Sequence, residues 1–159
     1  MSDRESTAEG RVLAVDDSPD ALHLLSVILK HRGFEVFLAD GGVAGLEIAR
    51  RHSVDAILLD VMMPDMNGLE VCRHLKRAPE TASIPVILVT ARDDIETRSQ
   101  GMEIGVADYL TKPLNQEELV RRLRVQIEGR RTFLRLEDAH RRLEAWDLGT
   151  GDGSARAPR

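Results

Sequence analysis

Hydrophobic positions along the chain form short runs that alternate with longer amphipathic segments. The runs are rich in Val, Ile and Leu and have the length of β-strands; they occupy residues 11–15, 34–40, 54–60, 84–90 and 107–111. Between them, apolar residues recur at helical spacing, in residues 18–33, 41–52, 68–77, 93–104 and a last segment that begins near residue 115. The pattern therefore predicts five strands and five helices in strict alternation.

This alternation indicates how the strands are arranged. A strand that is followed by a helix and then another strand is typical of a parallel sheet, with helices covering both faces through right-handed crossovers. The runs at 11–15, 54–60 and 84–90 are almost continuously apolar, as expected for parallel strands that are buried on both faces. We therefore expect an α/β fold with a five-stranded parallel sheet.

Composition and charge narrow the class of protein. The 159 residues are 42% hydrophobic and 31% charged, which is typical of a soluble globular domain with some additional chain. The net charge is −5 and the acidity lies in residues 1–113, which argues against direct nucleic-acid binding. Cys72 is the single cysteine, so an intramolecular disulfide is excluded. The sequence shows neither a signal peptide nor an apolar run long enough to insert in a membrane, and we expect a cytoplasmic protein.

Polar residues follow the predicted strands at their carboxyl ends. Asp16 and Asp17 follow the first strand, Asp60 ends the third, Thr90 ends the fourth and Lys112 follows the fifth. In an open parallel sheet these ends share one edge, where ligands bind. We therefore expect three carboxylates, a hydroxyl and an ammonium group to converge there.

Such a cluster has restricted chemistry. Two carboxylates about 4 Å apart repel each other by about 4 kcal/mol at an effective dielectric constant near 20, so three of them call for a cation. Ligand sets that contain only oxygen favour Mg²⁺, which often bridges to a phosphate. A carboxylate can also attack phosphorus and form an aspartyl phosphate. Asp60, which stands alone at the end of a central strand, is the best candidate for that nucleophile.

Four short motifs at these strand ends resemble those of one known family. They are "VDD" at 15–17, "LLDVMMPDMNG" at 58–68, "VTA" at 89–91 and "YLTKP" at 109–113. With them, residues from about 10 to 128 resemble the receiver domain of bacterial two-component response regulators. The resemblance implies a flavodoxin-like, doubly wound fold with strand order 2-1-3-4-5. It also implies that the chain receives a phosphoryl group from a histidine kinase or phosphotransfer protein and controls a downstream protein target. By the same resemblance, the chain would catalyse no reaction except its own phosphorylation and dephosphorylation.

The resemblance assigns roles around the acceptor. Asp60 matches the phospho-acceptor. Asp60 and Asp17 match the direct ligands of Mg²⁺, Asp16 matches a ligand that acts through water, and the backbone carbonyl of Met62 matches the third protein ligand. The side chains of Met62 and Arg92 occupy variable positions that tune the lifetime of the phosphoryl group.

It also assigns the residues that respond to phosphorylation. Thr90 matches the hydroxyl that binds the phosphoryl oxygens, and Lys112 the cation that pairs with them. Pro113 matches a proline whose preceding peptide bond is often cis. Tyr109 matches the aromatic residue that turns inward when Thr90 moves. The implied result is a changed surface on the fourth helix, fifth strand and fifth helix.

Three alternatives stay open. An aspartate-nucleophile phosphatase would carry a second aspartate two residues after the first, where this chain has Met62. A receiver-like module that is never phosphorylated would often lack one of the site residues, and this chain retains them all. The chain could also be the front part of a longer regulator with an output domain.

The last helix is predicted to continue beyond the receiver. Leu136, Ala139, Leu143 and Trp146 recur at spacings of 3, 4 and 3, a heptad-like seam of under two heptads. This segment is a solvated helix, a coiled coil that forms a homodimer, or a signalling linker. The expected organisation is a disordered N-terminus at 1–10, a receiver at 11–128, a helical extension at 129–147 and a disordered tail at 148–159.

Overall fold

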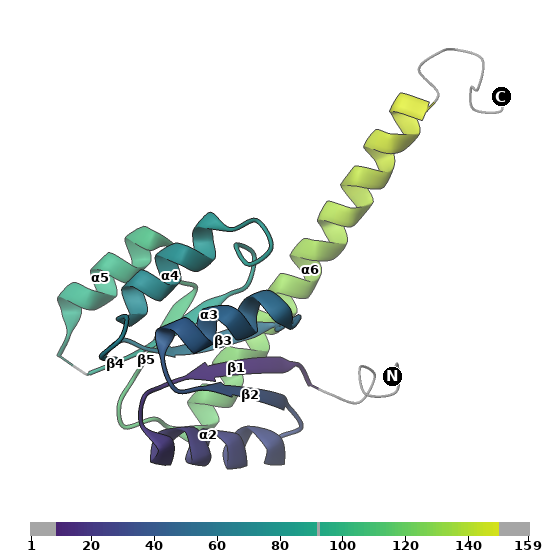
Figure 1. Ribbon diagram of the computed structural model, residues 1–159. Coiled ribbons are helices and arrows are strands. Elements are labelled where there is room, and N and C mark those ends of the chain that lie inside the picture. The colour runs from purple at the N-terminus through teal and green to yellow at the C-terminus, as the bar shows by residue number, and fades with distance from the viewer. Residues whose placement is uncertain (1–8, 92, 150–159) are drawn as a thin grey trace.

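The computed structural model describes residues 9–91 and 93–149, and within them strands and helices alternate as the sequence predicts (Figure 1). The strands are β1 (Arg11–Val15), β2 (Glu35–Ala39), β3 (Ala56–Asp60), β4 (Val86–Thr90) and β5 (Asp108–Thr111). The helices are α2 (Pro19–His31), α3 (Gly42–Arg51), α4 (Gly68–Arg77), α5 (Ile95–Ile104) and α6 (Gln116–Gly149). Each predicted boundary up to the start of α6 lies within two residues of the observed one.

The five strands form one parallel sheet in the order β2-β1-β3-β4-β5. Val12 on β1 pairs with Val36 on one side and with Ala56 on the other, so β1 lies between β2 and β3. Every residue of β3 and β4 is buried, because helices cover both faces of the sheet. The flavodoxin-like fold expected from the sequence is confirmed.

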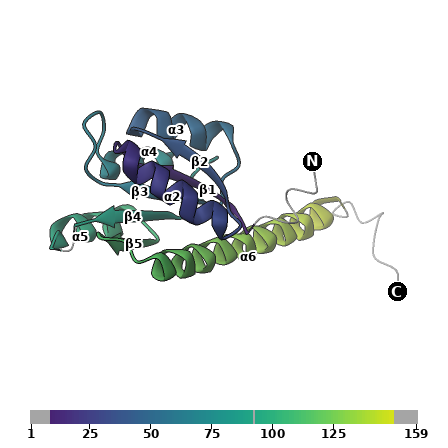
Figure 2. The same ribbon diagram turned by 90° about the horizontal axis from the view of Figure 1, so that it is seen from below.

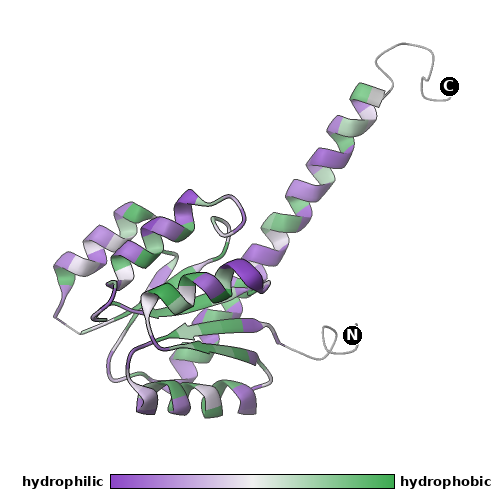
Figure 3. Ribbon diagram, in the orientation of Figure 1, coloured by the Kyte–Doolittle hydropathy of each residue, from purple (hydrophilic) through white to green (hydrophobic). Residues whose placement is uncertain are grey.

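Helices cover the sheet in two layers, with α2 and α6 on one face and α3, α4 and α5 on the other (Figures 1 and 2). Successive strand residues point to opposite faces. Leu13 and Val15 therefore pack in the cluster with α3 and α4, whereas Val12 and Ala14 pack in the cluster with α2 and α6. Figure 3 shows largely hydrophobic strands between helices in which hydrophobic and hydrophilic residues are interspersed. This two-sided core fixes the position of every strand end.

The N-terminal boundary differs from the prediction at two residues. Glu9 and Gly10 were expected to be disordered, but the amide of Glu9 donates to the carbonyl oxygen of Gly33 at 2.9 Å. The amide of Glu35 likewise donates to the carbonyl oxygen of Gly10 at 2.9 Å, which extends the β1–β2 pairing by one residue. Backbone pairing thus orders a polar segment whose composition suggested fraying. Residues 1–8 lie outside the described residues.

Helix α6 has 34 residues and continues through Gly129 without a break. Its first half is anchored to the sheet by apolar side chains, at Leu119, Val120, Leu123 and Ile127. It ends at Gly149, so residues 148 and 149, which were expected in the disordered tail, are helical. Helix ends are the least certain feature of a sequence prediction, because helices fray at their ends and the last helical residue is defined only to within one or two residues. Residues 150–159 lie outside the described residues.

Candidate phosphoryl-acceptor and metal site

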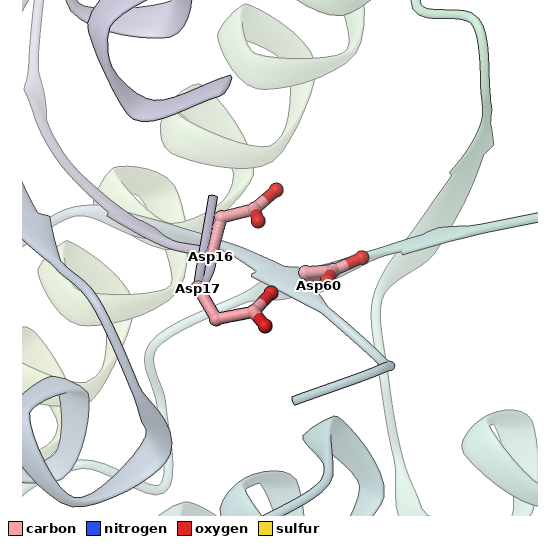
Figure 4. A group of neighbouring side chains, drawn as sticks. All are labelled: Asp16, Asp17 and Asp60. Atoms are coloured by element: carbon pink, nitrogen blue, oxygen red, sulfur yellow. The ribbon is translucent and has the colours of Figure 1, made fainter. Parts of the chain in front are cut away.

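Three aspartates meet at the carboxyl edge of the sheet. Asp16 and Asp17 follow β1 and Asp60 ends the neighbouring strand β3 (Figure 4). One carboxylate oxygen of each lies within 4.8 Å of the others. Asp16 and Asp60 are each 5% exposed, whereas Asp17 is exposed to solvent. The convergence predicted from the strand ends is confirmed.

Asp60 lies at the centre of the site. Burial raises the pKa of its carboxyl above the usual range, and the charges of Asp16 and Asp17 raise it further, while the hydrogen bond from Lys112 opposes this shift. The ammonium nitrogen of Lys112 lies 3.0 Å from Oδ1 of Asp60. Three carboxylates and one ammonium group leave a net charge of about −2 when all are ionised, which one divalent cation would neutralise.

Lys112 is held in place from the backbone as well. Its amide donates to the carbonyl oxygen of Thr90 at 2.9 Å, which continues the β4–β5 pairing. The peptide bond between Lys112 and Pro113 is cis, as the resemblance implied. Burial would lower the pKa of Lys112, but the hydrogen bond and charge of Asp60 outweigh burial and raise it. The side chain therefore stays charged at neutral pH and can bind an anion.

Thr90 has a buried hydroxyl that no described residue satisfies. The residue is 2% exposed and its Oγ1 has no hydrogen-bond partner among the described residues. Buried polar groups are normally paired, and an unpaired one is costly. A pocket of about 450 Å³ opens here, lined by Asp60, Val61, Met62, Val89, Thr90, Ala91, Asp93, Asp94 and Lys112. A ligand with acceptor oxygens, such as a phosphoryl group, would satisfy the hydroxyl.

Asp93 and Asp94 were not singled out from the sequence, although two acidic residues directly after "VTAR" were a visible signal. Asp94 is the N-cap of α5, and its side chain accepts a hydrogen bond from the amide of Thr97 at 3.1 Å. The hydrogen bond from the side chain of Thr97 lowers the pKa of Asp94 most, and the hydrogen bond from the Thr97 amide lowers it further. Asp94 therefore has a structural role at the rim of the pocket.

A glycine allows the chain to turn sharply behind Asp60. A Cβ atom on Gly68 would lie 2.6 Å from the carbonyl oxygen of Asp60, closer than real Cβ atoms approach. The amide of Gly68 donates to the carbonyl oxygen of Val61 at 2.8 Å. Helix α4 can thus start directly against the end of β3. The intervening loop leaves Met62 75% exposed at the mouth of the pocket.

The other end of this loop is tied to α3 by Asp65. Its carboxylate accepts hydrogen bonds from the amides of Gly42, Val43 and Met66 at 3.1, 3.2 and 2.8 Å. The backbone hydrogen bonds lower the pKa of Asp65, with that from Gly42 contributing most. Asp65 therefore shapes the loop, as its position in a turn-rich motif suggested.

Tyr109 lies on β5 and is partly buried against the core cluster of α3 and α4. The guanidinium of Arg98 on α5 lies 4.6 Å from the centre of its ring. The same guanidinium donates to the carbonyl oxygen of Ala91, beside Thr90, at 3.5 Å. Sequence reasoning missed Arg98, since no motif marks it and only its place in the helix before Tyr109 hinted at contact. Arg92 lies outside the described residues, so its assigned role stays a prediction.

The fold and the acidic edge together define a receiver-type signalling domain. A sequence model of the family described as "Response regulator receiver domain" matches residues 12–124. The chain therefore belongs to the family of response regulator receiver domains of two-component signalling.

Several curated relatives share this domain. Protein PilH of Pseudomonas aeruginosa is 38% identical over 119 residues, which cover 75% of this chain and 98% of PilH. Response regulator PleD of Caulobacter vibrioides is 46% identical over 114 residues, which cover 72% of this chain and 25% of PleD. The DNA-binding dual master transcriptional regulator RpaA of Synechocystis is 40% identical over 114 residues, which cover 72% of this chain and 47% of RpaA. The chain thus spans nearly all of PilH but half or less of the two longer regulators.

Solved structures agree with this assignment. The receiver domain of the sensor histidine kinase PA1611 from Pseudomonas aeruginosa PAO1 is 29% identical, with a TM-score of 0.70 over 75% of this chain and 98% of that chain. It was solved with a magnesium ion coordinated in its active-site cleft. The chemotaxis protein CheY4 of Vibrio cholerae is 33% identical, with a TM-score of 0.68 over 71% of this chain and 94% of that chain.

Proposed function

We propose that this chain accepts a phosphoryl group on Asp60 from a histidine kinase or phosphotransfer protein, and passes the signal to a protein target. The observation that supports this most strongly is the set of groups around one carboxylate. Asp60 has a neighbouring ammonium group 3.0 Å away, two further aspartates, and the unsatisfied hydroxyl of Thr90 in the adjoining pocket. Each of these features matches a need of phosphoryl transfer, namely a nucleophile, a metal site and donors for the phosphoryl oxygens.

Magnesium is the cation that fits the acidic cluster. Asp17 and Asp60 would bind it directly, Asp16 through water, and the backbone carbonyl of Met62 would complete the protein ligands. All of these donors are oxygen atoms, and the described residues bring neither His nor Cys into the cluster, which favours Mg²⁺ over zinc. Bound Mg²⁺ supplies positive charge to the phosphoryl oxygens.

The transfer step can be written for the residues of this chain. A carboxylate oxygen of Asp60 attacks phosphorus, and the bond between phosphorus and the donor's histidine nitrogen breaks, leaving its electron pair on that nitrogen. The ammonium of Lys112 and the hydroxyl of Thr90 donate to the phosphoryl oxygens in the product. Hydrolysis of the acyl phosphate returns Asp60 to its starting form. The chain thus promotes only its own phosphorylation and dephosphorylation.

Phosphorylation would then alter a surface. The phosphoryl group adds roughly −1.5 to −2 charge, and it gives the hydroxyl of Thr90 the acceptor that it lacks. Movement of Thr90 toward the phosphoryl group would also disturb Ala91 and Arg98, and so release Tyr109 to turn inward. Shifting a population from 1:99 to 99:1 takes about 5.5 kcal/mol, and two or three hydrogen bonds to charged groups at about 1.5 to 3 kcal/mol each supply it. The affected surface is formed by α5, β5 and α6.

The downstream target is a protein that reads this surface. Since PleD and RpaA extend well beyond the matched region, the chain could equally be the receiver part of a longer regulator. RpaA is described as DNA-binding, so the expectation that this chain binds no nucleic acid stays a prediction. No described helix combines the length and apolar character needed to cross a membrane.

Labelling with acetyl phosphate tests the proposal and its alternatives. We expect Mg²⁺-dependent incorporation of one phosphoryl group, stable to acid and labile to hydroxylamine as an acyl phosphate is, and lost in Asp60→Asn. Asp65→Asn is the matched control, because it changes an aspartate of the same loop that binds only backbone amides. Full labelling of Asp60→Asn would refute the assignment. Turnover of external phosphate esters would indicate a phosphatase, and neither reaction would indicate an interaction module that is not phosphorylated.

A further inference from the structure

The second half of α6 leaves the domain (Figures 1 and 2). It carries a row of exposed apolar side chains. We call this row the α6 seam and define it as Leu136, Ala139, Leu143 and Trp146. Leu136, Leu143 and Trp146 are 66%, 65% and 59% exposed. The last ion pair and the last hydrogen bond between α6 and the described part of the domain come from Arg130, whose guanidinium lies 3.3 Å from Asp55, and from Arg131, which donates to the carbonyl oxygen of Glu9 at 3.3 Å.

Such an extension is poorly stabilised alone. About 18 residues follow Arg131, or roughly 27 Å of helix at 1.5 Å per residue. The extension is only a little longer than the roughly 12 to 15 residues below which isolated helices are marginal in water, and helices in proteins take most of their stability from an apolar face packed against a neighbour. The extension does have such a face. Leu136 and Leu143 are one heptad apart, and Ala139 and Trp146 form the second row of the same seam.

The charges beside the seam indicate what covers it. With Leu136 and Leu143 at the first heptad position, Arg142 takes the last position of one heptad and Asp147 the fifth position of the next. In a parallel two-stranded coiled coil these two positions face each other across the interface. Each Arg142 would therefore meet Asp147 of the other copy, giving two attractive pairs. An antiparallel arrangement would bring Arg142 against Arg142 of the other copy.

We propose that the α6 seam pairs with the seam of a second copy of this chain, in a parallel and in-register two-stranded coiled coil. Parallel pairing places both receiver domains at the same end of the coil, each joined to it by one continuous helix. A seam of under two heptads forms a weak interface, so the dimer dissociates on dilution. The pairing uses none of the residues around Asp60, and it goes beyond the proposed phosphoryl transfer.

Charge reversal on the full chain tests the proposal by analytical ultracentrifugation over a range of concentrations. We expect Arg142→Asp alone and Asp147→Arg alone to dimerise about tenfold more weakly than the unchanged chain, since each places like charges at two sites. An equimolar mixture of the two variants should recover dimer, because the mixed pair restores opposite charges at both sites. A mixture of Arg142→Asp with the unchanged chain should not recover it, whereas antiparallel pairing would favour that mixture.

Disulfide trapping gives an independent readout of register. Ala139→Cys places a thiol in the seam, and two such thiols face each other only when the helices are parallel and in register. Cys72, the one native thiol, is fully buried and does not interfere. We expect rapid crosslinking of Ala139→Cys, and none in the control Glu137→Cys, which lies outside the seam. A monomer at every concentration, or a dimer that ignores both charge reversals, would overturn the proposal, while labelling of Asp60 in the same samples reports separately on the proposed function.

Discussion

Removal of the charge on Asp60 should stabilise the protein in the absence of metal, although it abolishes the proposed function. The carboxylate is 5% exposed and lies within 4.8 Å of carboxylate oxygens from Asp16 and Asp17. At an effective dielectric constant of 20, each of these two repulsions costs about 3.5 kcal/mol. The attraction of Lys112 at 3.0 Å offsets about 5.5 kcal/mol of their sum.

Asp17 and Lys112 are both substantially exposed, so solvent screens these terms and the net effect is smaller. With a dielectric constant between 20 and 80, the repulsion by Asp16 and Asp17 exceeds the attraction of Lys112 by about 1 kcal/mol, so removing the charge of Asp60 stabilises the fold by about that amount. A neutral side chain also avoids the cost of burying a charge, which adds to the stabilisation. A domain of this size would show that gain as a rise in Tm of about 3 °C for Asp60→Asn.

The contribution of Asp60 to folding stability changes with pH in a definite direction. The folded-state pKa of Asp60 is raised above its unfolded value, so its protonated form favours folding below about pH 4, and that contribution is lost as the pH rises through the folded pKa. The advantage of Asp60→Asn should therefore be full at neutral pH and shrink as the pH falls through that value. Added Mg²⁺ should raise Tm of the unchanged chain and have much less effect on the variant.

Differential scanning calorimetry with and without MgCl₂ measures both effects. Asp65→Asn is the opposite control: the pKa of Asp65 is lowered by backbone hydrogen bonds, so neutralising it should lower Tm at neutral pH. If Asp60→Asn melted below the unchanged chain in EDTA, the attraction of Lys112 would exceed the repulsion, and the case for an electrostatically strained metal site would fail.

Further outcomes follow from the same geometry. Asp17→Asn should weaken Mg²⁺ binding, measured by calorimetry, and slow acetyl phosphate labelling, because one ligand charge is removed. Lys112→Ala should bind Mg²⁺ at least as tightly but lose the phosphoryl-driven switch, and loss of Mg²⁺ binding would contradict its role as an anion partner. Beryllofluoride with Mg²⁺ should shift the amide resonances around Tyr109, and unchanged spectra would argue against the switch. Beryllofluoride should also strengthen dimerisation and change Trp146 fluorescence, with truncation after Glu128 removing the dimer but not the labelling.

Much of the fold and site could be predicted because both depend on local patterns. Apolar runs ending in Asp60 and Thr90 locate strand ends, and in a parallel sheet strand ends converge. Arg98 could not be found this way, since its contact with Tyr109 depends on how α5 packs beside β5. Glu9 was missed for a similar reason, because its order comes from pairing with Gly33 and from an ion pair with Arg124 at 3.1 Å. Contacts between distant segments have no local signature.

The attachment of α6 explains how events at Asp60 could reach a seam that begins at Leu136. Arg122 binds Asp108 at the start of the edge strand β5, at 2.6 Å, and Arg130 binds Asp55, which directly precedes the central strand β3, at 3.3 Å. These two ion pairs hold α6 at points about 12 Å apart along its axis, at 1.5 Å per residue. A movement of β5 would therefore change the tilt of α6 more readily than the length of the helix. Since the helix runs unbroken into the extension, a small tilt displaces the far end of the seam most. Phosphorylation would thus favour dimerisation by orienting two existing seams, without creating a new one.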